Sequence, residues 1–198
     1  MARSIDVGPE SKDRPTVIGS GTWVDKTNPA NAIGIITYID IWVAIQPMND
    51  VKVASFFPVD ATHFSTREYC SLGNITSAGQ NTFDAENGDF TPFEIKTDDW
   101  IGIYYSSGRI DLTTTAGVGF WGPTPPGDAI PCTNTEFMEQ KVTTTMSLYA
   151  EGYQLGSINI GDAWKVIQNI KINIGDDWKQ ILPGSKINIG DVWKDICH

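Results

Sequence analysis

The chain ends in three copies of a motif in which a Gly-Asp pair is followed, after one variable residue, by a tryptophan and a lysine. The copies read INIGDAWKVI, INIGDDWKQI and INIGDVWKDI, and they begin at Ile158, Ile172 and Ile187. An aromatic ring next to an ammonium group offers apolar contact and charge at one point, and repetition multiplies that contact. The candidate residues for assembly or ligand contact are Trp164, Trp178, Trp193, Lys165, Lys179 and Lys194.

Each copy has the pattern of a β-hairpin with the Gly-Asp pair at its tip. A three-residue loop would pair Ile160 with Trp164 and Asn159 with Lys165, and this register is favoured because it separates apolar from polar side chains. A two-residue loop would pair Trp164 with Asn159, and this alternative stays open. A single hairpin is only marginally stable in water. The repeats therefore need a partner surface, which is the preceding domain, the repeats of other copies, or another protein.

Residues for catalysis are few. The two histidines are His63 and His198, and the sequence contains no common metalloprotease, nucleotide-binding or serine-hydrolase motif. His63 lies seven residues before Cys70 without an orienting third group, which favours a loop histidine and a core cysteine. A carbohydrate-active enzyme would need two converging carboxylates, and its candidates are isolated acids, namely Asp99, Glu94 and Asp111.

Metal, cofactor and disulfide chemistry are also weakly indicated. The acidic stretch 84–89 does not fit a helix-loop-helix calcium loop, because Gly88 is its fifth position and Ile95 its twelfth. A turn at Asn87-Gly88 with solvated carboxylates is the better interpretation, and no metal or cofactor is predicted. The cysteines cannot all pair within one chain, although a bridge between Cys70 and Cys132 stays open.

The overall charge excludes one class of partner. Among 198 residues, 24 are acidic and 14 are Lys or Arg, so the net charge is -10. Such a chain is not expected to bind nucleic acid through its phosphates. Without a long apolar run or a signal-like start, we also expect no membrane partner and no classical export signal.

The elements that carry these residues are predicted to be strands. In the run 33–45, the residues Ile35, Thr37, Ile39, Ile41, Val43 and Ile45 alternate with polar or aromatic ones, which predicts a long strand with its aliphatic face inward. Asn49-Asp50 is predicted to end it before a strand at 51–59. Further strands are expected at 73–78, 81–85, 90–96, 100–107, 109–115, 118–122 and 143–153.

No segment shows the periodicity of a helix, so the predicted fold class is all-β. Residues 1–22 are expected to form an extended N-terminal arm. Residues 23–156 are expected to form an antiparallel, jelly-roll-like β-sandwich, and residues 157–198 to form three short β-hairpin repeats.

The region 28–153 resembles an uncharacterised β-sandwich domain found in bacteriophage, prophage and environmental viral sequences, over about two thirds of the chain. The segments that carry this resemblance are N-P-A-N-A-x-G (28–34), I-D-I-W-V-A (39–44), V-K-V-A-S-F (51–56), F-S-T-R-E (64–68), D-D-W-I-G-I-Y-Y (98–105), I-P-C-T-N (130–134) and M-S-L-Y-A-E-G (146–152). The I-N-I-G-D-x-W-K repeats are similar to the Trp-Lys hairpin repeats that end many phage tail, fibre and other virion proteins. The resemblance implies no catalytic or metal-binding residues.

Together, these features predict a non-enzymatic virion structural protein, associated with a phage tail or fibre or with a surface appendage, and assembled in the host cytoplasm. Its expected partners are copies of itself, as a trimer or larger homo-oligomer, and other virion proteins. A receptor- or glycan-binding adhesin that contacts host surface glycan is the main alternative. A carbohydrate-active enzyme and a cellular surface filament protein are weaker alternatives.

Overall fold

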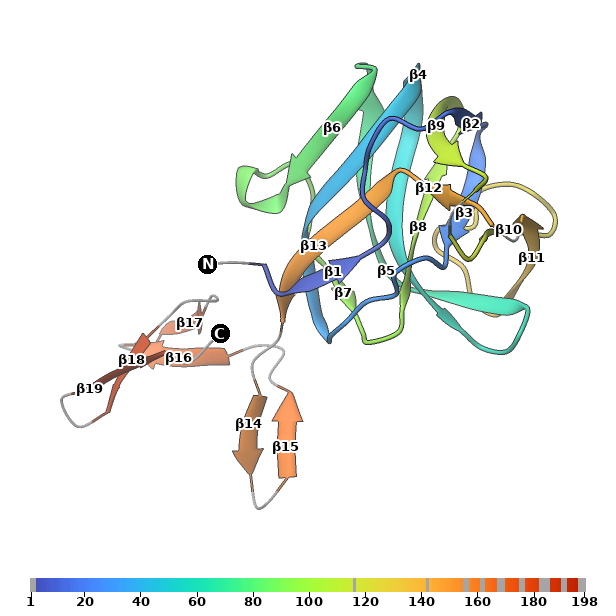
Figure 1. The fold of residues 1–198 in the computed structure, drawn as a ribbon. Helices are drawn as coiled ribbons and strands as arrows, with labels where there is room; N and C mark the ends of the chain where they lie inside the picture. The colour runs from blue at the N-terminus through green and yellow to red at the C-terminus, as the bar shows by residue number, and fades with distance from the viewer. Residues whose placement is uncertain are drawn as a thin grey trace.

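The computed structural model describes residues 3–115, 117–141 and 143–154, together with six short backbone strands between residues 157 and 195. All strand pairings in this part of the chain are antiparallel. A single short 3-10 helix is the only helical element among the described residues. The predicted all-β antiparallel fold is confirmed (Figure 1).

Thirteen strands form one connected sheet system in residues 3–154, which we call the β domain. Its elements are β1 (Ile5–Val7), β2 (Thr16–Ile18), β3 (Gly21–Asp25), β4 (Gly34–Pro58), β5 (His63–Ile75), β6 (Gly79–Asp84), η1 (Ala85–Asn87), β7 (Phe93–Ile95), β8 (Trp100–Tyr105), β9 (Ser107–Thr113), β10 (Phe120–Pro123), β11 (Thr135–Lys141), β12 (Thr145–Met146) and β13 (Leu148–Gln154).

Strand β4 connects two parts of this system. Its N-terminal part pairs with β13 on one side and with β6 and β7 on the other. We call the sheet that these strands form the β13 sheet, and it also contains β1, β2, β9 and β12. Its C-terminal part pairs with β5 and β8. Further pairings of β5 with β11, β11 with β10, β10 with β3, and β3 with β8 close a ring of six strands.

The predicted turn at Asn49-Asp50 is wrong, because β4 runs through it for 25 residues. The turn-forming residues have a different effect here. Asp50 adopts a left-handed φ of 54°, and the pairing with β5 shifts register between Met48 and Val51. The polar pair therefore produces an irregularity that lets one strand pass from the β13 sheet into the ring.

The alternation predicted for 33–45 is mostly correct. Ile39, Ile41 and Val43 are buried, whereas Ile45 at the end of the run is 50% exposed. At the other end, Ile36 is buried in place of Ile35, because the pairing with β13 shifts register between Glu151 and Gly152. A register shift moves the alternation by one residue, so the inward face changes there.

Aromatic side chains fill the ring. Phe56, Phe64 and Phe137 are completely buried or nearly so, and the Phe64 ring lies edge-on to Phe137 with centroids 5.2 Å apart. Trp100 and Trp121 each approach the Phe64 ring with centroids 5.6 Å apart. Since every strand of the ring contributes to this cluster, the ring has its own apolar core.

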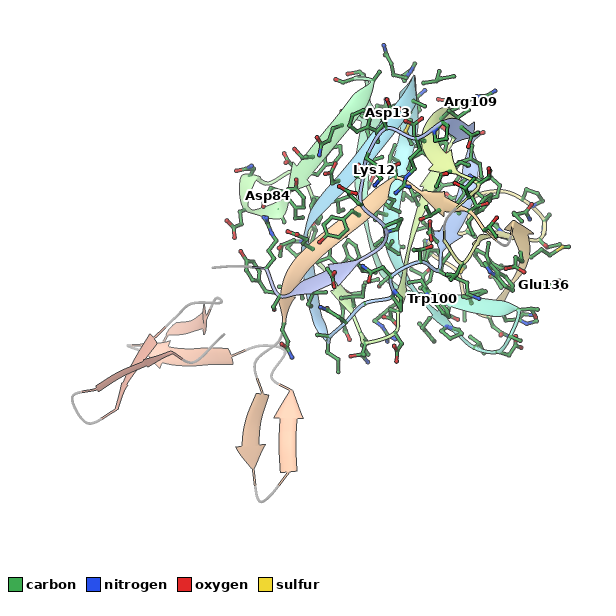
Figure 2. All side chains as sticks on the ribbon, in the orientation of Figure 1. Lys12, Asp13, Asp84, Trp100, Arg109 and Glu136 are labelled. Atoms are coloured by element: carbon green, nitrogen blue, oxygen red, sulfur yellow. The ribbon has the colours of Figure 1, made fainter. Side chains whose placement is uncertain are left out.

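The segment expected to be an N-terminal arm contributes strands to the β domain. β1 pairs with β13 and buries Ile5 and Val7, while β2 pairs with β9. Lys12, Arg109 and Glu136 are among the charged residues exposed on the outside of the domain (Figure 2).

The three repeats each form a separate two-stranded sheet. Their strands are β14 (Ser157–Ile160) with β15 (Ala163–Val166), β16 (Ile170–Ile174) with β17 (Asp177–Ile181), and β18 (Lys186–Ile189) with β19 (Val192–Asp195). The favoured register is wrong: Trp164 pairs with Asn159, not with Ile160. Two residues separate the strands, and two-residue loops are the commonest hairpin connections.

Gly152 offers a direct test of the packing between β13 and β4. A Cβ atom at this position would overlap the backbone carbonyl of Ile35, which cannot move without disturbing the pairing. We expect Gly152→Ala to lower the free energy of unfolding by about 2 kcal/mol in urea denaturation. Gly19→Ala is the matched control, since no atom lies within 4 Å of its added Cβ. Equal stability of the two variants would contradict the register of β13.

Candidate functional site

The histidine and cysteine considered for catalysis do not form a pair. His63 Nδ1 lies 2.9 Å from Asp60 Oδ1, and the Thr62 N–H and His63 lower the pKa of that carboxyl to about 2. Cys70 lies further along β5, where burial raises the pKa of its thiol to about 12. A thiol with this pKa is almost fully protonated at neutral pH and is a poor nucleophile. Cys70 and Cys132 are both free, so the bridge left open between them is absent.

The three acids considered for glycoside chemistry have separate partners. Asp99 accepts hydrogen bonds from Arg67, Asp111 accepts one from the Arg14 backbone N–H at 3.3 Å, and Glu94 lies 3.4 Å from Lys96 Nζ. Burial raises the pKa of Asp111. The three acids are therefore held by different groups of the β domain.

The acidic stretch 84–89 forms a capped turn. Asp84 is the N-cap of η1, its side chain accepts from the Glu86 N–H at 2.9 Å, and Gly88 ends the helix with a left-handed φ of 82°. Arg3 also donates to Asp84 at 2.5 Å. In the described residues, no group of three His, Cys, Asp or Glu side chains is arranged to hold a metal ion. No helix in this part of the chain is long and apolar enough to cross a membrane.

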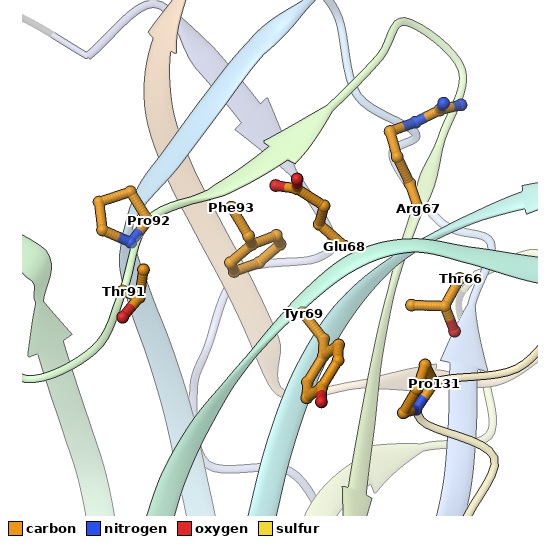
Figure 3. Close-up of a pocket in the computed structure, with 8 residues that line it drawn as sticks. All are labelled: Thr66, Arg67, Glu68, Tyr69, Thr91, Pro92, Phe93 and Pro131. Atoms are coloured by element: carbon orange, nitrogen blue, oxygen red, sulfur yellow. The ribbon is translucent and has the colours of Figure 1, made fainter.

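An open pocket of about 370 Å³ lies beside β5, and we call it the β5 pocket. Figure 3 shows Thr91 and Pro92 on one side of it and Thr66 and Pro131 on the other, with Tyr69 between them. The remaining lining residues are Arg67, Glu68 and Phe93. Tyr69 is 44% exposed, which is high for a large aromatic residue.

A bulge in β5 determines where these side chains point. Thr66 pairs with Phe56 and Tyr69 with Ala54, so that both Arg67 and Glu68 lie opposite Ser55. The buried Ser55 hydroxyl donates to the Glu94 carbonyl at 2.7 Å and lies 3.4 Å from both the carbonyl and the N–H of Glu68. Bulges redirect side chains, and this one is held in place by a buried hydroxyl.

Buried Asp99 fixes the side chain of Arg67. Asp99 is 2% exposed, and it accepts from Arg67 Nε at 2.6 Å and from Nη2 at 2.9 Å. These hydrogen bonds raise the pKa of Arg67. The guanidinium extends away from the other pocket residues (Figure 3). The charge of Arg67 is therefore already neutralised inside the protein.

Glu68 supplies the carboxylate of the β5 pocket. Its Oε2 atom accepts from the Glu94 N–H at 2.6 Å, which holds the carboxylate in one orientation. Glu68 is the only carboxylate among the lining residues. An oriented acceptor next to an exposed ring suits the binding of an uncharged polar ligand.

The six residues predicted for assembly or ligand contact lie on the strands of the repeats. Trp164 and Lys165 belong to β15, and the equivalent pairs belong to β17 and β19. The register is the same in all three hairpins, with each tryptophan opposite the asparagine of its own motif, in the pairs Asn159–Trp164, Asn173–Trp178 and Asn188–Trp193. What the tryptophan and lysine side chains contact lies outside the described residues.

The pocket residues were not among the predicted site residues. The segment around Tyr69 has no clear alternation, and its strand was predicted only from residue 73 onward. The one sequence feature that could have indicated this site is a large aromatic residue, Tyr69, next to charged residues.

No family model matches the chain, and comparisons with curated proteins and with solved structures give no match either.

Proposed function

We propose that this chain is a non-enzymatic structural component of a virus particle, in a tail, fibre or surface appendage, and that its repeats join copies of the chain into a homo-oligomer. The observation that carries the proposal is that three hairpins of nearly identical sequence share one register, each in its own two-stranded sheet. A two-stranded sheet alone has no second layer to cover its apolar residues. Contacts between copies would supply that layer.

Symmetry supports the same proposal. Hairpins of nearly identical sequence present similar faces. A contact that one hairpin makes with a second copy of the chain can therefore be made by the other two hairpins, and by every copy around a symmetry axis. Three weak contacts on one chain then act together, which gives a stable assembly without a large interface at any one hairpin. The location in a virion rests on the similarity of the repeat motif to repeats of phage tail and fibre proteins. Other virion proteins are the expected neighbours.

Light scattering on the full chain tests the assembly. We expect a trimer or larger, and we expect the variant with Trp164→Ser, Trp178→Ser and Trp193→Ser to be a monomer. The matched control replaces three exposed apolar residues of the β domain by serine, namely Val59, Val118 and Met138, and should keep the mass of the original chain. A monomeric original chain, or an unchanged mass after the tryptophan replacements, would refute the proposal. Mass spectrometry of purified particles tests the location.

A further inference from the structure

We propose that the β5 pocket binds a neutral hexopyranose unit of a glycan, with Tyr69 as the stacking surface and Glu68 as the acceptor for sugar hydroxyls. This site lies in the β domain and does not depend on assembly through the repeats. It adds a recognition function to the structural role proposed above.

The exposed ring of Tyr69 is the first reason. Its neighbour Cys70 is 3% exposed and pairs with Val53, so the backbone that carries the ring is fixed in the sheet. Tyr69 as a whole is 44% exposed, and its side chain lies between two threonines and two prolines (Figure 3). A pyranose ring has one face of C–H groups, and such a face removes water from an aromatic ring when it stacks on it.

The orientation of Glu68 is the second reason. One of its oxygens is engaged by the Glu94 N–H, and among the described residues no hydrogen bond is made to the other oxygen, Oε1. A hydroxyl group that donates to a carboxylate forms a short, strong hydrogen bond. A sugar presents such hydroxyls around the edge of the same ring whose face stacks on Tyr69. Both residues line the β5 pocket, so the proposal requires that one ligand reach both of them.

Charge and size restrict the ligand class. The β5 pocket has one carboxylate, Glu68, which is held by the Glu94 N–H, while its nearby cation, Arg67, is already paired with Asp99. An acidic sugar would meet Glu68 without a compensating charge, so a neutral sugar is favoured. The volume of about 370 Å³ is near the small end of the range for small-molecule pockets, roughly 300–1,000 Å³.

The exposed edge of the β5 pocket and its single carboxylate favour binding of a glycan without hydrolysis of its glycosidic bonds. Thr91, Pro92 and Pro131 are exposed at the edge, so a bound sugar can continue into a longer chain on the outside. Hydrolysis of a glycosidic bond would require a second carboxylate across the bond, and the lining residues include only Glu68.

Saturation-transfer NMR and titration of the full chain test the site. The probes are the methyl glycosides of glucose, galactose and mannose, with methyl glucuronide as the charged analogue. We expect millimolar binding of at least one neutral glycoside and weaker binding of the glucuronide. Tyr69→Ala should reduce affinity about tenfold or more, while Tyr69→Phe should stay within about twofold. Glu68→Gln should weaken binding several-fold.

The control is Tyr153→Ala, which removes a half-buried tyrosine of β13 outside the β5 pocket and should bind like the original chain. Absence of binding by all three neutral glycosides, tighter binding of the glucuronide, or unchanged binding by Tyr69→Ala would each overturn the proposal. Light scattering of the same samples reports the assembly separately, so failure at this site is distinguishable from failure of the proposed function.

Discussion

Replacing Asp25 with alanine is expected to lower the free energy of unfolding by about 4 kcal/mol. Asp25 lies on β3, is completely buried, and accepts hydrogen bonds from the Thr27 N–H at 2.7 Å, the Met146 N–H at 2.6 Å and the Thr145 hydroxyl at 3.1 Å. Removing the carboxyl leaves these donors without an acceptor, and each buried unsatisfied donor costs about 1–3 kcal/mol.

The position of Asp25 explains why the effect should be large. β3 belongs to the ring, whereas β12, which carries Thr145 and Met146, pairs with β9 in the β13 sheet. One carboxyl therefore joins the two parts of the β domain. Urea denaturation followed by tryptophan fluorescence measures the loss, and thermal unfolding should show a fall in Tm of about 10 °C. The control Glu139→Ala removes an exposed carboxylate from β11 and should change the free energy by less than about 0.5 kcal/mol.

The same variant has a predictable pH dependence. Burial raises the pKa of Asp25, so the folded chain keeps its proton to a higher pH than the unfolded chain does. The contribution of Asp25 is then complete below the ordinary carboxyl pKa and decreases as pH rises through the folded pKa. The difference in stability between the original chain and Asp25→Ala should accordingly be larger at acidic than at neutral pH. A larger difference at neutral pH would contradict the raised pKa.

Hydrophobic periodicity correctly predicted the N-terminal part of strand β4. The alternation around Ile39, Ile41 and Val43 predicted a long strand with a buried face, and these residues are in the core. The ring was not predicted, because its closure depends on pairings between distant strands such as β3 with β10. Strand order is a property of long-range contacts, which local patterns do not encode.

Strand β5 shows why the candidate site could not be predicted. Its residues are mostly polar or half-exposed, and the bulge at Arg67 and Glu68 interrupts the two-residue period. The bulge that shapes the β5 pocket thus also removes the alternation from which the strand could have been predicted. The hairpins show a related limit. Sorting apolar from polar residues favoured one register, whereas the observed register pairs Trp164 with Asn159 and leaves two residues between the strands.

Replacing Asp99 with alanine is expected to cost about 3 kcal/mol of stability. Asp99 precedes β8 and accepts from two nitrogens of Arg67 on β5, and its Oδ2 atom also accepts from the Lys96 N–H at 2.8 Å. Loss of one member of a buried ion pair costs about 3–5 kcal/mol, and the Arg67 side chain is 19% exposed, so the lower end applies. Urea denaturation measures the change, with Glu136→Ala as the exposed control.

A double-mutant cycle separates the ion pair from the other contacts of Asp99. If the cost arises from an unpaired guanidinium, the variant with both Arg67→Ala and Asp99→Ala should be no less stable than Asp99→Ala alone. Strictly additive losses would contradict that origin.

The single replacement Asp99→Ala also has a consequence for the β5 pocket. Because Arg67 then lacks its internal counter-charge, the affinity for methyl glucuronide relative to the neutral glycosides should rise several-fold. An unchanged affinity ratio would show that pairing with Asp99 does not set the charge preference of the pocket.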